Sequence, residues 1–316
     1  MNTSQEIIDK INNHSNILLS LHVNPDGDSL GSCVAMKKYL QSQGKKVTIV
    51  SPDPLPEMIA HLSYANEVEF RKDIFDVMEG KDLLIALDVP TLDRLSKKDQ
   101  KVTIPTIRID HHDTKTDFAE VNFVDPKEPS TCSLLLRIFK ETNIDFGADI
   151  ANPLLLGIVT DTNFFVIGIK INEVFGDVQY LISKGADYNQ VLQEVYYNKP
   201  LGMKKAVGKL FNNLVMEDNI AYSTVSKEEL SELGLNMGDM RIAIKELTGI
   251  KGADIVFALV EGEKAIKASL RSQHIDISKA AEELGGGGHS YASGFSREGT
   301  LEEAVTQTLA VVKKYL

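Results

Sequence analysis

Apolar runs and helical segments alternate along the first part of the chain. Short runs of the kind that form strands buried on both faces occur at 16–24, 46–51, 82–89 and 106–110. A helix is predicted between the first two runs, over 29–43, with Gly44 as its end. Strands separated by helices need crossover connections, which give a parallel sheet. The pattern therefore predicts an α/β fold with a mostly parallel sheet and flanking helices.

Further helical segments follow before the pattern changes. Helices are expected in the segments that start at Pro129 and Leu154 and over residues 170–187. The second of these segments has the composition of either a helix or a strand, and we favour a helix. Proline and glycine then interrupt the chain at Asn198–Gly202, which predicts a linker over 191–205. We therefore expect one domain over 1–190 and a smaller one over 206–316.

The second domain has a different pattern. Apolar runs typical of strands occur at 220–225, 253–260 and 265–272. The segment Glu261–Lys264 between the last two runs is a hairpin signal. Two helices open with capping boxes, Ser226 with Glu229 and Thr300 with Glu303. These features predict an α+β domain with antiparallel strand pairs.

Composition and charge narrow the class of protein. The chain has 316 residues with 34 Lys or Arg and 45 Asp or Glu, which gives a net charge of −11. A negative net charge argues against a protein that coats long nucleic acid, although local cations can still hold a short anionic substrate. Two cysteines, Cys33 and Cys132, fit a reducing compartment. Because the chain also lacks a membrane-spanning apolar run and a signal-like N-terminus, we expect a cytoplasmic protein without a membrane partner.

Acidic and imidazole side chains gather where the predicted strands and one apolar segment end. They are His22, Asp26, Asp28, Asp88, Asp110, His111, His112 and Asp161. The carboxyl ends of parallel strands share one edge of a sheet, so these groups are expected in one place. A single aspartate after a strand is usually a turn or cap residue, but so many carboxylates together would repel one another. Divalent cations are the simplest remedy, and the joint pattern predicts a metal site.

The kinds of ligand indicate which metal is bound and how many ions. Carboxylates suit Mg²⁺ and Mn²⁺, while imidazole shifts the preference toward transition metals. We therefore expect Mn²⁺, with Co²⁺, Fe²⁺ or Mg²⁺ as substitutes. The set is too large for one six-coordinate ion with an open position, and it suits two ions about 3.5–4 Å apart that share a carboxylate. Such a pair activates a bridging water or hydroxide and clamps a phosphoryl group.

Four motifs stand out in the first domain: His22–Ser32, Asp88, Asp110–His112 and Gly157–Thr162. Together they resemble the motifs of the DHH phosphoesterases. In the second domain, Arg271–Ser272 and Gly285–Gly294 resemble the substrate-binding domain associated with that family. The resemblance implies a catalytic domain over 1–190, a linker over 191–205, a substrate-binding domain over 206–316 and an active site in the cleft between them. Within the family, the sequence is most similar to bacterial oligoribonucleases of the nanoRNase type.

The resemblance also implies a role for each residue. One Mn²⁺ would be held by His22, Asp26 and Asp88. The other would be held by Asp28, His111, Asp161 and the bridging Asp88. Asp110 would orient the histidines, and His112 would contact the scissile phosphate or assist the leaving oxygen. The sequence departs from the family pattern at Asn163, where glycine is common, and at Val89–Pro90, where small hydroxyl residues are common.

A run of four glycines in the second domain favours a phosphate clamp. The run Gly285–Gly288 lets backbone N–H groups approach an anion, although alone it also fits a flexible helix C-cap. His289 directly after the run and Arg271 at a strand end favour the clamp, because an arginine fork suits a phosphate. The predicted substrate-binding residues are Arg271, Ser272, Gly286, Gly287, Gly288 and His289.

The expected function is manganese-dependent hydrolysis of short oligoribonucleotides or linear dinucleotides to mononucleotides. Removal of the 3′-phosphate from adenosine 3′,5′-bisphosphate is a further expected activity, and linear or cyclic di-adenylate is an open alternative substrate. A manganese-dependent inorganic pyrophosphatase has a similar first motif, but a site rich in Lys and Arg would be expected in its C-terminal half. A non-catalytic nucleotide- or RNA-binding module would be expected to lack at least one aspartate. The sequence leaves a homodimer open.

Overall fold

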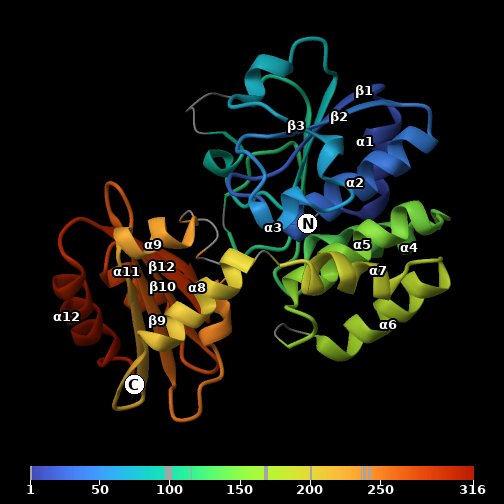
Figure 1. Cartoon of the computed structure of the whole chain (residues 1–316). Helices are drawn as coiled ribbons and strands as arrows, with labels where there is room; N and C mark the ends of the chain where they lie inside the picture. The colour runs from blue at the N-terminus through green and yellow to red at the C-terminus, as the bar shows by residue number, and fades with distance from the viewer. Residues whose placement is uncertain are drawn as a thin grey trace. The chain divides into compact units, whose positions relative to one another are not determined.

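A computed structural model describes residues 2–96, 102–114, 116–166, 170–199, 201–235, 237, 240 and 243–316, with only the backbone of residue 289. The chain forms two compact units, Met1–Asn198 and Lys199–Leu316 (Figure 1). Each unit has its own sheet and its own hydrophobic cores, so each is described by itself.

The first unit is built on a six-stranded parallel sheet. Its strands are β1 (Asn16–Ser20), β2 (Lys46–Ser51), β3 (Val68–Phe70), β4 (Leu83–Leu87), β5 (Thr106–Asp110) and β6 (Val121–Val124). They lie in the order β3-β2-β1-β4-β5-β6, and all neighbouring pairs are parallel. The chain order reverses between β1 and β4, which makes this the switch point of the sheet. The predicted parallel sheet is confirmed, although the first strand ends at Ser20 and the short edge strands β3 and β6 were not predicted.

Alternate residues of the strands enter two separate cores. Ile17 and Leu19 of β1 pack with the helices on one face of the sheet. Leu18 of β1 and Leu84 of β4 pack on the other face with Ile74, which lies in a 3₁₀ turn. Because both faces are covered, the strands are apolar along their length and do not alternate with polar residues.

Helices and short turns complete the first unit. The helices are α1 (Ser4–Asn12), α2 (Gly27–Ser42), α3 (Glu57–Ala60), α4 (Thr131–Glu141), α5 (Ala148–Asp161), α6 (Ile171–Ser183) and α7 (Tyr188–Leu192). The 3₁₀ turns are Ala65–Glu67, Ile74–Val77 and Leu92–Arg94. The expected helix over 29–43 is α2, which starts earlier than predicted, at Gly27, because Asp26 caps it. The helical assignment of the segment that starts at Leu154 is also confirmed, since this segment is the end of α5.

The segment 191–205, expected to be a linker, is largely helical. α7 continues into a π-helix over Gln193–Tyr197, and α8 (Leu201–Asn212) follows. The two units divide between Asn198 and Lys199. The catalytic and substrate-binding roles expected of the two domains stay predictions.

The second unit has a six-stranded mixed sheet in the order β11-β12-β10-β9-β8-β7. Its strands are β7 (Val215–Glu217), β8 (Ile220–Val225), β9 (Ile255–Glu261), β10 (Ile266–Ser272), β11 (Gly287–His289) and β12 (Ala292–Arg297). Its longer helices are α8, α9 (Lys227–Leu233), α11 (Ser278–Glu283) and α12 (Leu301–Val312), with a 3₁₀ turn at Ile244–Leu247. Both predicted capping boxes are present, at Ser226 and Thr300. The expected antiparallel pairs are confirmed, but β8 and β9 are parallel because α9 lies in their long connection.

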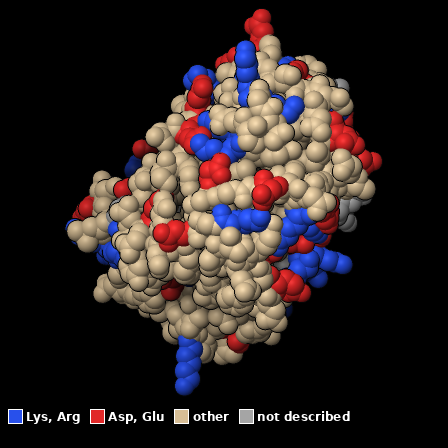
Figure 2. Space-filling view, turned by 90° about the vertical axis from the view of Figure 1, so that its right-hand side faces the viewer, with Lys and Arg blue, Asp and Glu red and all other residues tan. Residues whose placement is uncertain are grey.

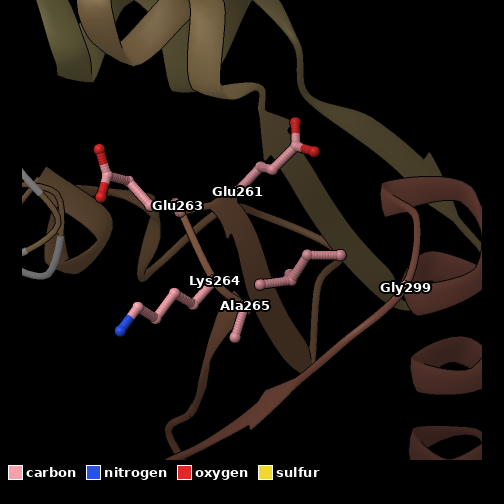
Figure 3. A pocket seen from close by; sticks show the side chains of 7 residues that line it. Glu261, Glu263, Lys264, Ala265 and Gly299 are labelled. Atoms are coloured by element: carbon pink, nitrogen blue, oxygen red, sulfur yellow. The ribbon is translucent and has the colours of Figure 1, made fainter.

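The predicted hairpin turn between β9 and β10 borders a small hollow. It has a volume of about 140 Å³ and is lined by Glu261, Glu263, Lys264 and Gly299, among others (Figure 3). The carboxylates of Glu261 and Glu263 point in different directions in this view, so they do not converge on one ligand.

The surface carries charges of both signs. On the face shown in Figure 2, the described Lys and Arg side chains are interspersed with Asp and Glu and form no continuous basic track. Within the described parts of the chain, no helix combines the length and the apolar character needed to cross a membrane.

Candidate active site

The switch point of the parallel sheet carries the predicted metal-binding residues. His22 follows β1, Asp88 follows β4, and His111 follows β5. The backbone of Asp88 lies in the left-handed region with φ 63°, a conformation that aspartate tolerates better than most residues. This turn directs the carboxylate of Asp88 toward residues of the neighbouring strand ends.

Three overlapping groups of side chains have ligand atoms within 4.8 Å of one another in the described part of the chain. The groups are His22 with Asp26 and Asp88, Asp28 with His111 and Asp161, and Asp88 with His111 and His112. The structure thus brings together all six predicted metal-binding residues and His112. Asp88 belongs to two of the groups, as expected of a shared carboxylate.

The two oxygens of Asp88 face different histidines. Oδ2 lies 3.3 Å from His22 Nε2, and Oδ1 lies 3.6 Å from His111 Nε2. His22 Nε2 is also 3.8 Å from Asp26 Oδ1, and His111 Nε2 is 3.4 Å from Asp161 Oδ2. Ligand atoms about 2.1 Å from one octahedral ion are about 3 Å apart, so these spacings suit side chains gathered around cations.

The start of α2 supplies two of the aspartates in different ways. Asp26 is the N-cap of α2 and accepts hydrogen bonds of 3.2 Å from the backbone N–H of Asp28 and Ser29. Asp28 is buried, and its two oxygens accept from the backbone N–H groups of Thr131 and Cys132 at 2.7 and 2.9 Å. The first turn of α4 therefore orients Asp28, a contribution that the sequence did not predict.

All three histidines direct Nδ1 toward a protein oxygen. Nδ1 of His22 lies 2.8 Å from the Val23 carbonyl, and Nδ1 of His111 lies 3.3 Å from the Glu128 carbonyl. A carbonyl can only accept, so these contacts place a proton on Nδ1 and leave the lone pair of Nε2 for an ion. His112 Nδ1 lies 2.7 Å from Asp110 Oδ1, which leaves Nε2 of His112 for another partner.

The clustered charges shift the pKa values of these groups. Burial lowers the pKa of His22, but Asp26 and Asp88 outweigh burial and raise it to about 10. Burial likewise lowers the pKa of His111, whereas Asp161 and Asp88 raise it to about 9. Burial, then Asp88 and Asp161, raise the pKa of Asp28 well above its usual range. Without a cation, the cluster needs protons to offset its carboxylates, so its donor set fits divalent metal ions.

Arg108 is a functional candidate that the sequence reasoning missed. Its side chain on β5 is fully buried, and its guanidinium donates to Asp110 Oδ2. Burial raises the pKa of Asp110, but the contacts with His112 and Arg108 outweigh burial and lower it. An arginine inside an otherwise apolar strand, two residues before the aspartate, was the signal that could have revealed this pair.

The predicted substrate-binding positions lie on β10 and at β11 of the second unit, the two strands that flank β12. Arg271 of β10 and His289 of β11 are both paired with Ala292 of β12. These positions are two strand spacings apart, which is about 10 Å. Ser272 has a structural role, because its hydroxyl donates to the Asp254 carbonyl at 2.8 Å and the residue is buried. The side chain of His289 lies outside the described atoms.

The four glycines of the predicted clamp differ in their surroundings. Gly285 and Gly288 have positive φ values of 81° and 144°, which favour glycine. A Cβ on Gly286 would lie 2.1 Å from the Gly294 carbonyl oxygen, so this position needs glycine for packing. No described atom lies within 4 Å of a Cβ built on Gly287. The same is true of Gly285, so Gly287 is the open glycine of the run that does not also have a positive φ.

Comparison with known proteins identifies the family. The DHH family N-terminal domain matches residues 16–158, and the DHHA1 domain matches residues 217–316. An uncharacterised protein of Methanocaldococcus jannaschii is 30% identical over 305 residues, which cover 89% of this chain and 86% of that protein. The chain belongs to the DHH family.

This DHH protein also resembles proteins whose names refer to an enzymatic activity. The bifunctional oligoribonuclease and PAP phosphatase NrnA of Thermus thermophilus is 25% identical over 312 residues, or 95% of this chain and 90% of that protein. A solved exopolyphosphatase-related protein of Bacteroides fragilis is 26% identical, with a TM-score of 0.91 over 99% of this chain and 96% of that chain. The DHH chain is accordingly an enzyme that hydrolyses phosphoester bonds.

The two departures from the DHH pattern have local explanations. Asn163 has a φ of 45°, so its position requires the left-handed backbone that glycine and asparagine adopt most readily. Val89 and Pro90 use their carbonyl oxygens, which accept from Arg108 Nε at 2.9 Å and from Thr114 Oγ1 at 3.0 Å. Neither departure removes a side chain from the three metal-binding groups.

Proposed function

We propose that this DHH enzyme is a manganese-dependent phosphodiesterase that hydrolyses short oligoribonucleotides or linear dinucleotides to mononucleotides. Removal of the 3′-phosphate from adenosine 3′,5′-bisphosphate is its second activity. The observation that carries the proposal is the convergence of six candidate metal-binding side chains, among them Asp88, whose oxygens face two histidines. A relative over 95% of the chain is named an oligoribonuclease and PAP phosphatase, which supports the substrate class.

The proposed ions would be held by two sets of side chains that share Asp88. His22, Asp26 and Asp88 form one set, and their ligand atoms converge. Asp28, His111 and Asp161 converge in the same way, and Asp88, whose Oδ1 lies 3.6 Å from His111 Nε2, would complete this second set. The oxygen and imidazole donors fit Mn²⁺, and neither group contains a thiolate. When bound, such ions stabilise charge on the phosphoryl oxygens and lower the pKa of an attacking water.

The chain's own residues orient the substrate and move a proton. His112 holds its Nδ1 proton against Asp110 and presents Nε2 toward the scissile phosphate or the leaving oxygen. A proton on Nε2 can then pass to the leaving oxygen as the ester bond breaks. Asp110 remains ionised during this step because the guanidinium of Arg108 donates a hydrogen bond to it and offsets its charge.

The second unit gives the preference for short substrates. Arg271 and the open side of Gly287 hold a phosphate or the terminal nucleotide of the substrate, with His289 at the neighbouring position. The interspersed charges in Figure 2 and the net charge of −11 disfavour a long polyanion.

Removal of metal is expected to abolish hydrolysis. After treatment with a chelator, Mn²⁺ should restore activity more fully than Mg²⁺, because the imidazole ligands favour a transition metal. The measurement is product chromatography with a dinucleotide, a short RNA, linear and cyclic di-adenylate, adenosine 3′,5′-bisphosphate and pyrophosphate. Full activity in the chelator would refute metal dependence, and pyrophosphate as the preferred substrate would indicate an inorganic pyrophosphatase.

Substitutions in the proposed clamp are expected to weaken substrate binding. Arg271→Ala removes a charge-assisted contact worth about 1.5–3 kcal/mol, so kcat/KM should fall about 10- to 150-fold, mainly through KM. Gly287→Val should act in the same direction by filling the open space beside the strand. Mn²⁺ content should not change in either variant.

Lys267→Ala is the matched control for the clamp. Lys267 is exposed on β10, four residues before Arg271 in the same strand, so both positions lie on one side of the sheet. Its removal should leave dinucleotide kinetics unchanged. Equal kinetics of wild type, Arg271→Ala and Gly287→Val would contradict the proposed clamp.

A further inference from the structure

We propose that Arg108 is a positioning residue for phosphoester hydrolysis, which acts by fixing Asp110 and, through it, the imidazole of His112. This inference rests on the role of His112 in the proposed function. Arg108 touches none of the reacting atoms. It acts by holding the two loops that follow β4 and β5 in place.

The guanidinium of Arg108 is fully enclosed by hydrogen-bond acceptors. The residue has 0% exposure, and its Nε donates to the Val89 carbonyl at 2.9 Å. Nη1 donates to the Thr116 carbonyl at 2.6 Å. Nη2 donates to Thr114 Oγ1 at 2.6 Å and to Asp110 Oδ2. Every nitrogen of the fork therefore has a partner.

These bonds join the loop after β4 to the loop after β5. Val89 directly follows Asp88, while Thr114 and Thr116 follow His112 closely in sequence. Thr114 Oγ1 also donates to the Pro90 carbonyl at 3.0 Å, which adds a second link between the loops. The planar fork of arginine can serve three directions at once, whereas a lysine provides one compact ammonium group.

Asp110 transmits this arrangement to the site. One carboxylate oxygen accepts from Arg108, and the other accepts from the ring Nδ1 of His112 at 2.7 Å. With both oxygens held, the carboxylate cannot turn, so the His112 ring keeps its Nδ1 proton and the direction of Nε2. Arg108 also offsets the charge of Asp110, which lies near the other carboxylates of the cluster.

A purely structural role would not require this arginine. A buried ion pair adds little net stability compared with well-packed apolar residues, because desolvation opposes the attraction. The neighbours of Arg108 in the strand, Ile107 and Ile109, are apolar and fully buried. The geometry points to orientation of the loop that carries His112.

The test is a double-mutant cycle between Arg108 and His112. Arg108→Lys should lower kcat for a dinucleotide about 10- to 100-fold, as loss of an outer partner of a metal site does, with KM and Mn²⁺ content nearly unchanged. In a His112→Ala background, the same substitution should change kcat less than about 3-fold, because residues that act as a unit are not additive. Arg71→Lys, at an exposed ion pair with Glu69, is the control and should behave as wild type.

Imidazole ¹H–¹⁵N correlation spectra give a readout without substrate. The His112 Nδ1–H signal should be protected from exchange with solvent in the wild-type chain, because Asp110 holds this proton, and should be broadened by exchange in Arg108→Lys. Thr114→Val removes only the hydrogen bonds of the Thr114 hydroxyl with Arg108 and Pro90. It should lower kcat by a smaller factor, and it replaces Arg108→Lys in the test if that variant does not fold. Equal losses of kcat in both backgrounds, or an unchanged His112 Nδ1–H signal in Arg108→Lys, would overturn the inference. A wild-type chain inactive on every substrate would instead refute the proposed function.

Discussion

Replacing Asp88 by asparagine is expected to cause the largest loss of turnover of any single substitution in the site. Asp88 would be a ligand of both proposed ions, since its Oδ2 lies 3.3 Å from His22 Nε2 and its Oδ1 lies 3.6 Å from His111 Nε2. Removal of one electrostatic donor from an active site costs about 10²–10³ in kcat. Here both ions lose a charged ligand, so kcat for a dinucleotide should fall at least about 10³-fold.

Asparagine suits this test because it spares the backbone. Asp88 has a φ of 63°, and asparagine also tolerates the left-handed region, whereas alanine would add strain. The measurements are kcat at saturating Mn²⁺ and the metal content of the purified chain. Asp93→Asn, at an exposed position in the following 3₁₀ turn, is the control and should retain activity. An Asp88→Asn enzyme within a factor of about ten of wild-type turnover would exclude the shared carboxylate.

The candidate metal-binding residues could be predicted because their signal is simple. Apolar runs predicted the strands, and the rule for parallel sheets predicted that residues at their carboxyl ends meet. His22, Asp88 and His111 obey this rule directly, since each follows a strand of the same sheet. The order of the strands, which places the switch point between β1 and β4, came from the structure. The rule that the carboxyl ends of parallel strands meet at one edge was enough to group these residues.

Residues that orient the metal-binding side chains leave weaker signals. The backbone N–H groups of Thr131 and Cys132 donate to Asp28. Nearly every residue type has such a group, so the residue types at these positions do not reveal the contact. Arg108 appears as one charged residue between Ile107 and Ile109, and only the three-dimensional path of the neighbouring loops reveals its partners. The edge strand β3 was missed because two of its three residues are exposed.

The glycine run shows a different limit. Four successive glycines suggest room for an anion, but the sequence cannot separate glycines needed for packing from glycines that face a ligand. Gly286 lies against the Gly294 carbonyl, and Gly285 and Gly288 need positive φ values. The clamp at this segment stays a prediction, and which of its glycines have an open side, Gly285 and Gly287, depends on the three-dimensional path of the chain around β11 and β12.

Gly157→Ala is expected to destabilise the first unit by about 1–3 kcal/mol, the usual cost of overpacking a core. A glycine-to-alanine change in a helix interior ordinarily has the opposite effect, because alanine stabilises a helix by about 1 kcal/mol relative to glycine. An added Cβ would lie 2.2 Å from Cys132 Sγ and 2.7 Å from Asp28 Oδ1. Both neighbours are buried, and hydrogen bonds of 2.7 and 2.9 Å hold the carboxylate of Asp28 in place. Gly176→Ala in α6, with no described atom within 4 Å, is the control and should not destabilise the chain.

The same substitution should lower Mn²⁺ affinity at least about 10-fold, because the new methyl group displaces a metal-binding carboxylate. Adding Cys132→Ala removes the contact with Sγ but leaves the methyl group 2.7 Å from Asp28 Oδ1. The double variant should therefore regain part of its stability, relative to the Cys132→Ala single variant, while Mn²⁺ affinity stays low. Urea unfolding and Mn²⁺ titration calorimetry measure the two effects separately. Wild-type Mn²⁺ affinity in a destabilised Gly157→Ala chain would mean that Gly157 serves helix packing alone and that Asp28 does not hold the ion.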